Sequence, residues 1–288
     1  CLNVVLRVIP LQIRSFEDLN LPAAMPESTH LQRGYVLVTG ATGMGKSTTL
    51  ASMINEINRE RKVKIVTVED PIEFVFTHDK SIITQREIGT DTRSFPDALR
   101  AALRQDPDVI MVGEMRDLET VDTSLKAAET GHLVFSSIHT NDVASTITRL
   151  VSFFPTEEQP QVRTRLAENL KAVVSLRLLV NKKGDGRVPA IEIMRSTRSI
   201  QECIKDASRN AEITDFIARG RTEQMQTFDQ HVLDLLRANK ISIETALSAA
   251  TNPDDFRTRL ALDGPLLEDD DRGEKSLNPF EIDSDERF

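Results

Sequence analysis

The segment Gly40-Ala41-Thr42-Gly43-Met44-Gly45-Lys46-Ser47 combines residue types and a spacing that suit phosphate binding. It matches the pattern glycine, four residues, glycine, lysine and serine or threonine, in which backbone N–H groups surround phosphate oxygens. In this pattern Lys46 neutralises the outer phosphates and the Ser47 hydroxyl coordinates Mg²⁺. Gly43 and Gly45 are expected to let the backbone approach a phosphate where a Cβ atom would clash. The segment, with Thr48, therefore predicts a site for a nucleoside triphosphate and Mg²⁺.

The residues around this segment supply the strand, turn and helix that such a loop requires. Tyr35–Thr39 is a short apolar run rich in β-branched residues, and apolar residues recur at helical spacing from Ser47 to Ile57. A helix that begins directly after the glycines points its free N–H groups at the phosphates. A glycine turn that merely begins a helix is the alternative, and this context disfavours it.

The net charge of the chain, −9 over 288 residues, is concentrated at one end. Residues 263–288 hold ten acidic and three basic side chains and therefore −7 of this charge. The remaining body, at −2, lacks the excess of basic residues that nucleic-acid-binding domains carry, so no nucleic-acid partner is expected. The run of charges and the two prolines after Gly264 predict a disordered acidic tail at 263–288.

Two cysteines, Cys1 and Cys203, are too few for a disulfide framework or a four-cysteine zinc site. No apolar run approaches the roughly 18 residues of a membrane span, and no signal peptide is visible. A cytoplasmic protein is expected. The sequence begins at Cys1 directly in a strand-like run, so residues 1–9 are expected to be the last strand of a truncated upstream domain. Residues 10–32, which include Pro22 and Pro26, are expected to form a linker.

From Gly34 the pattern alternates between strands and helices, which predicts an α/β fold over residues 33–262. Because the phosphate loop follows the first strand, the nucleotide is expected at the carboxyl ends of parallel strands. The strands expected after the first are 64–68, 82–84, 109–112, 133–138 and 188–193, the last of them after a hairpin turn at 183–186. The expected helices are 94–104, capped by Ser94, 118–129, 142–153 and 156–178, with several short helices over 199–262.

Acidic and polar residues follow three of these strands, where the fold would bring them near Ser47. They are Glu69, Asp70 and Glu73 after the strand at 64–68, Glu114 after that at 109–112, and His139 and Thr140 after that at 133–138. The aspartate that commonly ends such a strand is absent, and Glu114 follows Gly113 instead. A single carboxylate at a strand end is often only a helix cap or a surface charge. Three such ends behind one phosphate loop favour a site for phosphoryl transfer to water.

These segments together resemble the type IV pilus retraction ATPases, the PilT/PilU family of the secretion ATPase superfamily. The resemblance covers roughly residues 4–262 and includes four blocks: Gly40–Ser47 (Walker A), Glu69–Glu73 (the Asp box), Asp108–Asp117 (Walker B), and Ala128–His132 with His139–Asn141 (the His box). Gln85-Arg86-Glu87 and Met225-Gln226-Thr227 support it. The resemblance implies a RecA-like P-loop ATPase domain at 33–262, helical over 199–262, preceded at residues 1–9 by the end of a PAS-like domain.

The resemblance also implies roles for individual residues. Glu73 resembles the carboxylate that polarises the attacking water, and Glu114 resembles the Walker B acid that acts on the metal through water. His139 resembles the sensor of the γ-phosphate, and His132 is expected to line the same site. Arg7 matches an arginine that the N-terminal domain supplies to a nucleotide at a subunit interface. The alternatives are a surface arginine for Arg7 and a structural role for either histidine.

On this resemblance, the chain is expected to form a ring motor, a hexamer, that hydrolyses ATP to power pilus retraction and twitching motility. Its expected partners are the platform protein of the pilus in the inner membrane and a paralogous retraction ATPase, at the cytoplasmic side of that membrane. Two alternatives stay open: an accessory nucleotide-binding ring that modulates a principal motor, and a motor for pilus assembly or type II secretion. Many of the latter carry a four-cysteine insertion that this chain lacks.

One helix departs from the pattern of the retraction ATPases. Their segment Ala-Ile-Arg-Asn-Leu-Ile-Arg-Glu corresponds here to Ser199-Ile200-Gln201-Glu202-Cys203-Ile204-Lys205-Asp206. The spacing of Ile200 and Ile204 is retained, so the helix is expected to pack normally, but Gln201 replaces the first arginine. This replacement favours the accessory alternative, as does the acidic tail, which is more similar to PilU than to PilT.

Overall fold

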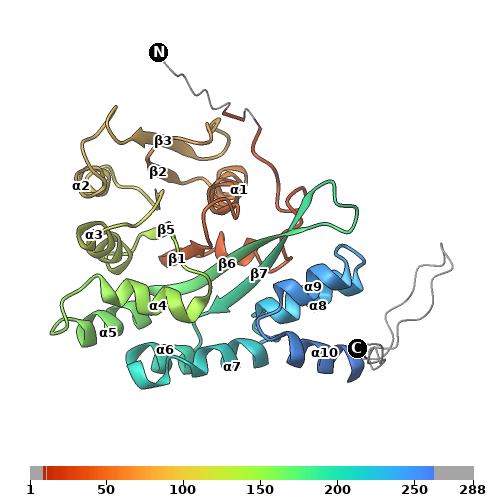
Figure 1. The fold of residues 1–288 in the computed structure, drawn as a ribbon. Helices are drawn as coiled ribbons and strands as arrows, with labels where there is room; N and C mark the ends of the chain where they lie inside the picture. Colours follow the sequence, from red (N-terminus) through yellow and green to blue (C-terminus); the bar gives the residue numbers. More distant parts are fainter. Residues whose placement is uncertain (1–8, 11, 263–288) are drawn as a thin grey trace, which may run out of the picture. The chain divides into compact units, whose positions relative to one another are not determined.

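The computed structural model of the chain describes residues 9–10 and 12–262 (Figure 1). Within these residues the chain forms a sheet of seven strands in the order β3-β2-β4-β5-β1-β6-β7. The pairs β2–β3, β2–β4, β4–β5, β1–β5 and β1–β6 are parallel. The chain then reverses at residues 181–186, and β7 returns beside β6. The sheet is therefore mixed, with the first strand, β1, between β5 and β6.

The elements have the following bounds. The strands are β1 (Gly34–Thr39), β2 (Lys64–Glu69), β3 (Ile82–Glu87), β4 (Val109–Val112), β5 (Leu133–Ile138), β6 (Leu170–Val180) and β7 (Arg187–Arg195). The helices are α1 (Lys46–Glu60), α2 (Phe95–Leu103), α3 (Leu118–Glu129), α4 (Val143–Ser152), α5 (Gln159–Asn169), α6 (Arg198–Lys205), α7 (Glu212–Arg219), α8 (Phe228–Arg237), α9 (Ile243–Ala249) and α10 (Pro253–Leu262). Short 3-10 turns occupy Pro26–Ser28 and Ala207–Arg209.

Side chains of the central strands alternate between two hydrophobic cores, one on each face of the sheet. In β1, Tyr35 and Leu37 belong to one core, and Val36 and Val38 belong to the other. These four side chains are completely buried, as expected for a strand that is covered on both faces. The continuous apolar sequence of β1, without a polar face, reflects this position.

The helices cover the two faces unequally. The core that contains Tyr35 and Leu37 also takes in apolar side chains from α2, α3, α4, α5, α6 and α7, and Figure 1 shows α2, α3, α5 and α6 following one another around this side. On the other face α1 contributes Leu50, Met53, Ile54 and Ile57. Side chains of the segment before β1, such as Phe16 and Met25, complete that second core. The helix after the phosphate loop is therefore held directly against the sheet.

Several helices begin where a short polar side chain accepts a backbone N–H. Ser94 accepts the N–H of Asp97 at the start of α2, as the sequence predicts. Asp117 and Asp142 do the same for α3 and α4, and Asp142 forms a reciprocal capping box with Ser145. These caps explain why α3 and α4 begin directly after the loops that leave the carboxyl ends of β4 and β5.

The predicted helix over 156–178 is wrong in its second half. Helix α5 ends at Asn169, and residues 170–180 form β6, whose residues Ala172 to Ser175 pair with β1. Leu166 and Leu170 have helical spacing, so the apolar run continues the helical pattern in the sequence. Within β6, however, Val173 and Val174 are completely buried on opposite faces of the sheet. Pairing along β1 therefore overrides the local helical pattern.

Most other predicted elements are confirmed, with boundaries that differ by a few residues. The strand predicted at 82–84 extends to Glu87, and that at 188–193 is part of β7. The helical segment predicted over 199–262 contains α6 to α10. Arg7 and the predicted last strand of an upstream domain lie almost entirely outside the described residues, as does the predicted tail at 263–288.

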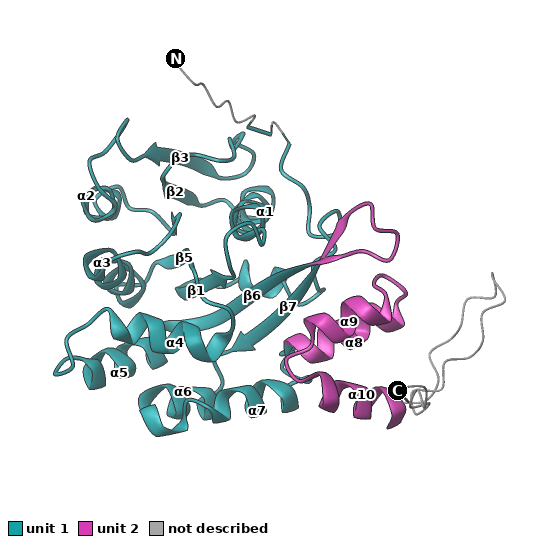
Figure 2. Cartoon of the chain, viewed as in Figure 1, with its two compact units in different colours: residues 1–178, 189–227 teal, residues 179–188, 228–288 magenta. Residues whose placement is uncertain are grey.

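The described residues divide into two compact units, which Figure 2 colours separately. The larger contains the chain as far as Leu178 together with Pro189–Thr227, and so holds the phosphate loop and helices α1 to α7. The smaller contains the tip of the β6–β7 hairpin, from Leu179 to Val188, and the helices from Phe228 onward. None of the helices among the described residues combines the length and apolar character that a membrane span requires.

Asn58 of α1 provides a test of how this helix holds the loop after β2. Its side chain donates to Thr77 O at 2.8 Å and accepts the Asp79 N–H at 3.1 Å, and it is 1% exposed. We expect Asn58→Leu to lower the free energy of unfolding by about 1–3 kcal/mol, because it leaves a carbonyl and an N–H without partners. Asn55→Leu on the same helix is the matched control, and denaturant unfolding of both variants is the measurement. An equal effect of the two substitutions would contradict this account.

Candidate nucleotide site

The phosphate loop, residues 40–47, has the backbone conformation that its glycines predict. Gly43 and Gly45 have φ values of 79° and 88°, which L-residues rarely adopt. A Cβ atom at either position would meet nothing within 4 Å, so backbone conformation and not crowding by protein atoms requires these two glycines. At Gly40 a Cβ would lie 2.7 Å from Leu176 O of β6. The first glycine therefore lets β6 pass close to the loop.

Helix α1 begins at Lys46 directly after the loop, with Gly45 as its N-cap residue. No side chain forms a cap hydrogen bond at this end, unlike at α2, α3 and α4. The first N–H groups of a helix have no partners within the helix, and the helix dipole makes this end favourable for anions. The start of α1 is therefore suited to bind phosphate groups.

Lys46 lies within the site, and the residue as a whole is buried, at 7% exposure. It donates to Gly40 O and Ala41 O at 3.0 Å each, and it lies 3.2 Å from His139 Nδ1. Burial lowers the pKa of Lys46, while the negative charges of Glu114 and Glu73 act in the opposite direction. The two carboxylates that the sequence singles out are thus within electrostatic range of this lysine.

His139 links Lys46 to Glu114. Its Nδ1 faces the lysine and its Nε2 lies 3.2 Å from Glu114 Oε2. Because an ammonium can only donate and a carboxylate can only accept, the arrangement fits a neutral imidazole that accepts at Nδ1 and donates from Nε2. The Glu114 carboxylate also forms an ion pair with Arg116. The ends of β4 and β5 therefore meet at the phosphate loop, as the sequence predicts.

The third strand end, β2, delivers the segment that carries Glu73. Glu69 is the last residue of β2 and is 7% exposed. Burial raises the pKa of Glu69, and hydrogen bonds from the Thr67 hydroxyl at 2.7 Å and from Gln85 at 3.1 Å oppose this shift. A cis peptide bond joins Asp70 to Pro71 directly after the strand. Glu69 is thus an anchor within the fold, and Glu73 is the carboxylate whose charge reaches Lys46.

The oxygen donors near the loop suit a magnesium ion that is bound mainly by a nucleotide. Ser47, in the first turn of α1, is exposed, and the Glu114 carboxylate follows β4 and lies beside His139. Within the described residues, no group of three or more His, Cys, Asp or Glu side chains is arranged to hold a metal by itself. Mg²⁺ commonly takes one or two protein oxygens together with phosphates and waters. The donor set therefore fits Mg²⁺ in company with a triphosphate.

The structure does not bring His132 to this site, which corrects the expectation that it lines the same site in this subunit. His132 directly precedes β5 and His139 directly follows it, so the two residues lie at opposite ends of this strand. Six strand residues separate the ends by about 20 Å. His132 O accepts the Gly34 N–H at 3.0 Å, and His132 Nδ1 lies 2.9 Å from Ala127 O. The strand between the two histidines in the sequence already indicates this separation.

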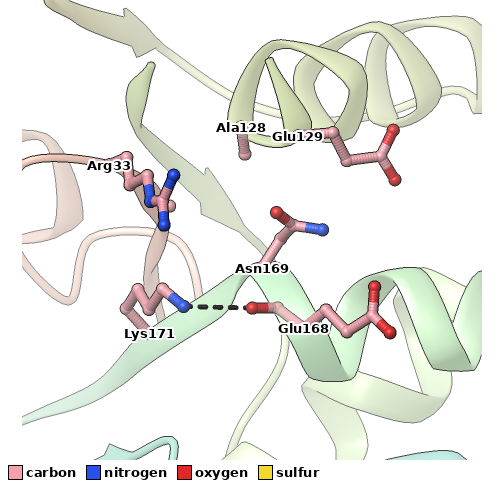
Figure 3. A pocket seen from close by; sticks show the side chains of 7 residues that line it. Arg33, Ala128, Glu129, Glu168, Asn169 and Lys171 are labelled. Carbon is pink, nitrogen blue, oxygen red and sulfur yellow. Dashed lines mark hydrogen bonds between the residues drawn. The ribbon is translucent and has the colours of Figure 1, made fainter. Parts of the chain in front are cut away.

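A cavity of about 140 Å³ also lies at the amino edge of the sheet (Figure 3). Figure 3 shows Arg33 and Lys171 on one side and Glu129 on the other. Its lining residues are Arg33, Gly34, Ala128, Glu129, Glu168, Asn169 and Lys171. Because β1 runs from Gly34 at this edge to Thr39 at the phosphate loop, the cavity is not part of the nucleotide site.

The helix that departs from the retraction ATPases packs as predicted. Ile200, Cys203 and Ile204 of α6 are completely buried in the core beside α5 and α7. Gln201 donates to Ser196 Oγ at 3.3 Å, next to the start of the helix. With glutamine at this position, α6 is a regular helix from Arg198 to Lys205 whose apolar face is buried.

Sequence reasoning missed two residues that support the site. Arg116, which pairs with Glu114, lies within the Walker B block and could have been noticed as the cation two residues after the acid. Glu192 of β7 is 4% exposed and accepts the N–H of Val143 at the start of α4. No pattern in the sequence links Glu192 to Val143, because only the sheet brings these two distant segments together.

Comparison with known proteins places these features in one family. Residues 3–258 match the protein family described as "Type II/IV secretion system protein". The twitching motility protein of Neisseria gonorrhoeae is 46% identical over 248 residues, which are 86% of this chain and 66% of that protein. In Pseudomonas aeruginosa, the retraction ATPase PilT is 46% identical over 254 residues and the ATPase PilU 40% over 260. These matches cover 88% and 90% of this chain and 73% and 68% of the two relatives.

A solved structure has the same fold. The pilus retraction motor PilT, determined with bound ADP, superposes with a TM-score of 0.79 at 48% sequence identity. The match covers 86% of this chain and 70% of that one. The chain thus spans about two thirds of the length of the relatives that it matches, and its similarity to pilus retraction ATPases extends over both sequence and fold.

The buried position of Lys46 predicts how nucleotide affinity depends on pH. Burial lowers the pKa of Lys46, and only the protonated ammonium attracts phosphate, so affinity should begin to fall at a lower pH than for an exposed lysine. Arginine stays protonated throughout this range, so Lys46→Arg should remove the fall. Titration with a fluorescent ATP analogue from neutral pH to about pH 10 measures the effect. The same pH dependence in both proteins would contradict the prediction.

Proposed function

Because the chain belongs to the family of type II/IV secretion system proteins, we propose that it is an ATP-hydrolysing ring motor that powers type IV pilus retraction. Its relatives include a twitching motility protein and a pilus retraction ATPase. The observation that carries the proposal is the series of contacts from Lys46 through His139 to Glu114 beside the phosphate loop. These contacts support the proposal because they bring a lysine, an imidazole and a carboxylate together beside the loop that would bind the nucleotide.

In this proposal the residues of the loop, from Gly40 to Thr48, bind ATP. Lys46 neutralises the outer phosphates, and Ser47 and Glu114, the latter through water, hold Mg²⁺. When bound, this ion supplies positive charge next to the phosphate oxygens. Glu73 polarises the attacking water. His139, whose Nδ1 lies 3.2 Å from the Lys46 ammonium, senses the γ-phosphate.

The motor proposal extends to assembly and location. Six copies form a ring in which Arg7 of one subunit reaches a nucleotide at the subunit interface, which couples hydrolysis to assembly. The linker at 10–32 lets an N-terminal domain close on the ATPase domain when ATP binds, and sequential closure turns the pilus platform protein at the cytoplasmic side of the inner membrane. The PilU relative supports a paralogous retraction ATPase as a further partner.

We predict that Glu73→Gln abolishes Mg²⁺-dependent ATP turnover but not nucleotide binding. Positioned bases contribute about 10²–10⁴ in rate, so kcat should fall by at least 10². Lys46→Ala should abolish turnover and also weaken ATP binding, because it removes a charge that acts on the bound phosphates. Phosphate release and binding of a fluorescent ATP analogue, measured on the purified full-length protein, give the two quantities.

Glu157→Gln, an exposed substitution of the same kind, is the matched control and should leave both quantities unchanged. The enzyme proposal fails if the wild-type protein shows no turnover that depends on Mg²⁺. The assignment of Glu73 alone fails if Glu73→Gln hydrolyses ATP at the wild-type rate.

A motility test separates a motor from an accessory ring. In cells that lack every paralogous retraction ATPase, the wild-type gene should restore twitching, because a motor needs no second ATPase. The Lys46→Ala gene should not restore it. Restoration only when an active paralogue is also present would favour the accessory role.

A further inference from the structure

Gln85 of β3 connects the end of β2 to the segment that follows Glu73. Its side-chain nitrogen donates to Phe74 O at 2.9 Å and to Glu69 Oε1 at 3.1 Å. Its side-chain oxygen accepts the Phe76 N–H at 3.0 Å. One amide therefore binds the segment on the carboxyl side of Glu73 at two backbone positions and joins it to a buried carboxylate.

The amide of Gln85 fits this place in one orientation. Its nitrogen faces two acceptors, the Phe74 carbonyl and the Glu69 carboxylate, and its oxygen faces a donor. The reversed amide would place oxygen against oxygen twice and N–H against N–H once. A carboxylate at position 85 would oppose the same two acceptors, and an apolar side chain would leave all three groups without this partner.

Glu69, the buried partner of Gln85, also holds the backbone of Glu73. The Glu69 carboxylate accepts hydrogen bonds from the Thr67 hydroxyl, from Gln85 and from the backbone N–H of Glu73. In the register of the two parallel strands Thr67 pairs with Gln85, so the side chains of Thr67, Glu69 and Gln85 share one face of the sheet. The same hydrogen-bonded group therefore contacts the chain at Glu73 itself and directly after it.

A second contact from β3 holds the chain directly before Glu73. Glu87, which pairs with Glu69 in the register of the strands, accepts the Ile72 N–H at 3.0 Å. Side chains of β3 thus bind backbone groups at Ile72, Phe74 and Phe76, on both sides of Glu73. Hydrogen bonds from this edge strand therefore fix the backbone conformation of the segment from 72 to 76.

We propose that Gln85 is a positioning residue for ATP hydrolysis, which holds the segment around Glu73 in the geometry that this carboxylate needs. The inference rests on the proposed function, in which Glu73 polarises the attacking water. In this proposal Gln85 acts through the backbone of Phe74 and Phe76 and through Glu69, the groups that its side chain binds. A displacement of about 1 Å in a catalytic group can lower a rate by about 10²-fold, so loss of these contacts should appear in kcat.

The experiment compares Gln85→Met and Gln85→Glu with wild-type full-length protein, alone and combined with Glu73→Gln. Gln85→Met should lower kcat about tenfold to a hundredfold, change the affinity for Mg²⁺-ADP by less than about twofold, and cause no further loss in the Glu73→Gln background. Gln85→Glu should lower kcat more, since a second carboxylate then faces Glu69. Amide hydrogen exchange of the peptide around 72–78 should become faster in both variants.

Gln159→Met at the start of α5 is the matched control, because Gln159 is also partly buried and donates one side-chain hydrogen bond, to Phe154 O at 3.1 Å. It should leave kcat and exchange at 72–78 unchanged. Full turnover in Gln85→Met, a further loss when it is combined with Glu73→Gln, or unchanged exchange at 72–78 would each overturn the positioning role. These outcomes differ from failure of the proposed function, in which the wild-type protein itself shows no Mg²⁺-dependent turnover.

Discussion

The site depends on one buried cation, the ammonium of Lys46, and on the groups that surround it. Burial lowers the pKa of a lysine, here at 7% exposure, because the charged ammonium loses its contact with water. Hydrogen-bond acceptors and negative charges nearby oppose this shift. Here two carbonyls of the phosphate loop and the imidazole of His139 surround the ammonium, and the charges of Glu114 and Glu73 oppose the lowered pKa only in part. Each comes from a different segment of the chain, so the requirements of this one group constrain the loop and three strand ends together.

The order of the strands explains how these segments meet. In a parallel sheet every strand ends at the same edge, so β2, β4 and β5 deliver Glu69, Glu114 and His139 to the edge where β1 ends at Thr39. The Asp70–Glu73 segment needs a further support because it leaves the sheet. Gln85 and Glu87 of the edge strand β3 provide it through hydrogen bonds to the backbone. The edge strand β3 thus supports the site by holding the backbone around Glu73.

The two errors of sequence reasoning have physical causes. The stretch after Asn169 retains helical spacing, and only pairing with β1 makes Val173 and Val174 core residues of opposite faces. His132 belongs to the same sequence block as His139, yet a whole strand lies between them, so the two imidazoles are at opposite ends of β5. In the first case the local sequence suggested a helix, and in the second it suggested one shared site. In both, the extended geometry of a strand gave a different arrangement.

The sequence alone determined the phosphate loop, the alternation of strands and helices, and the acidic and imidazole groups at three strand ends. These features are local, since glycine conformations, apolar periods and strand termini are set by neighbouring residues. The tertiary structure decided where α5 gives way to β6, and that Gln85 and Glu69 anchor the chain around Glu73. Those outcomes depend on hydrogen bonds and burial between segments far apart in the chain, and no local pattern encodes them.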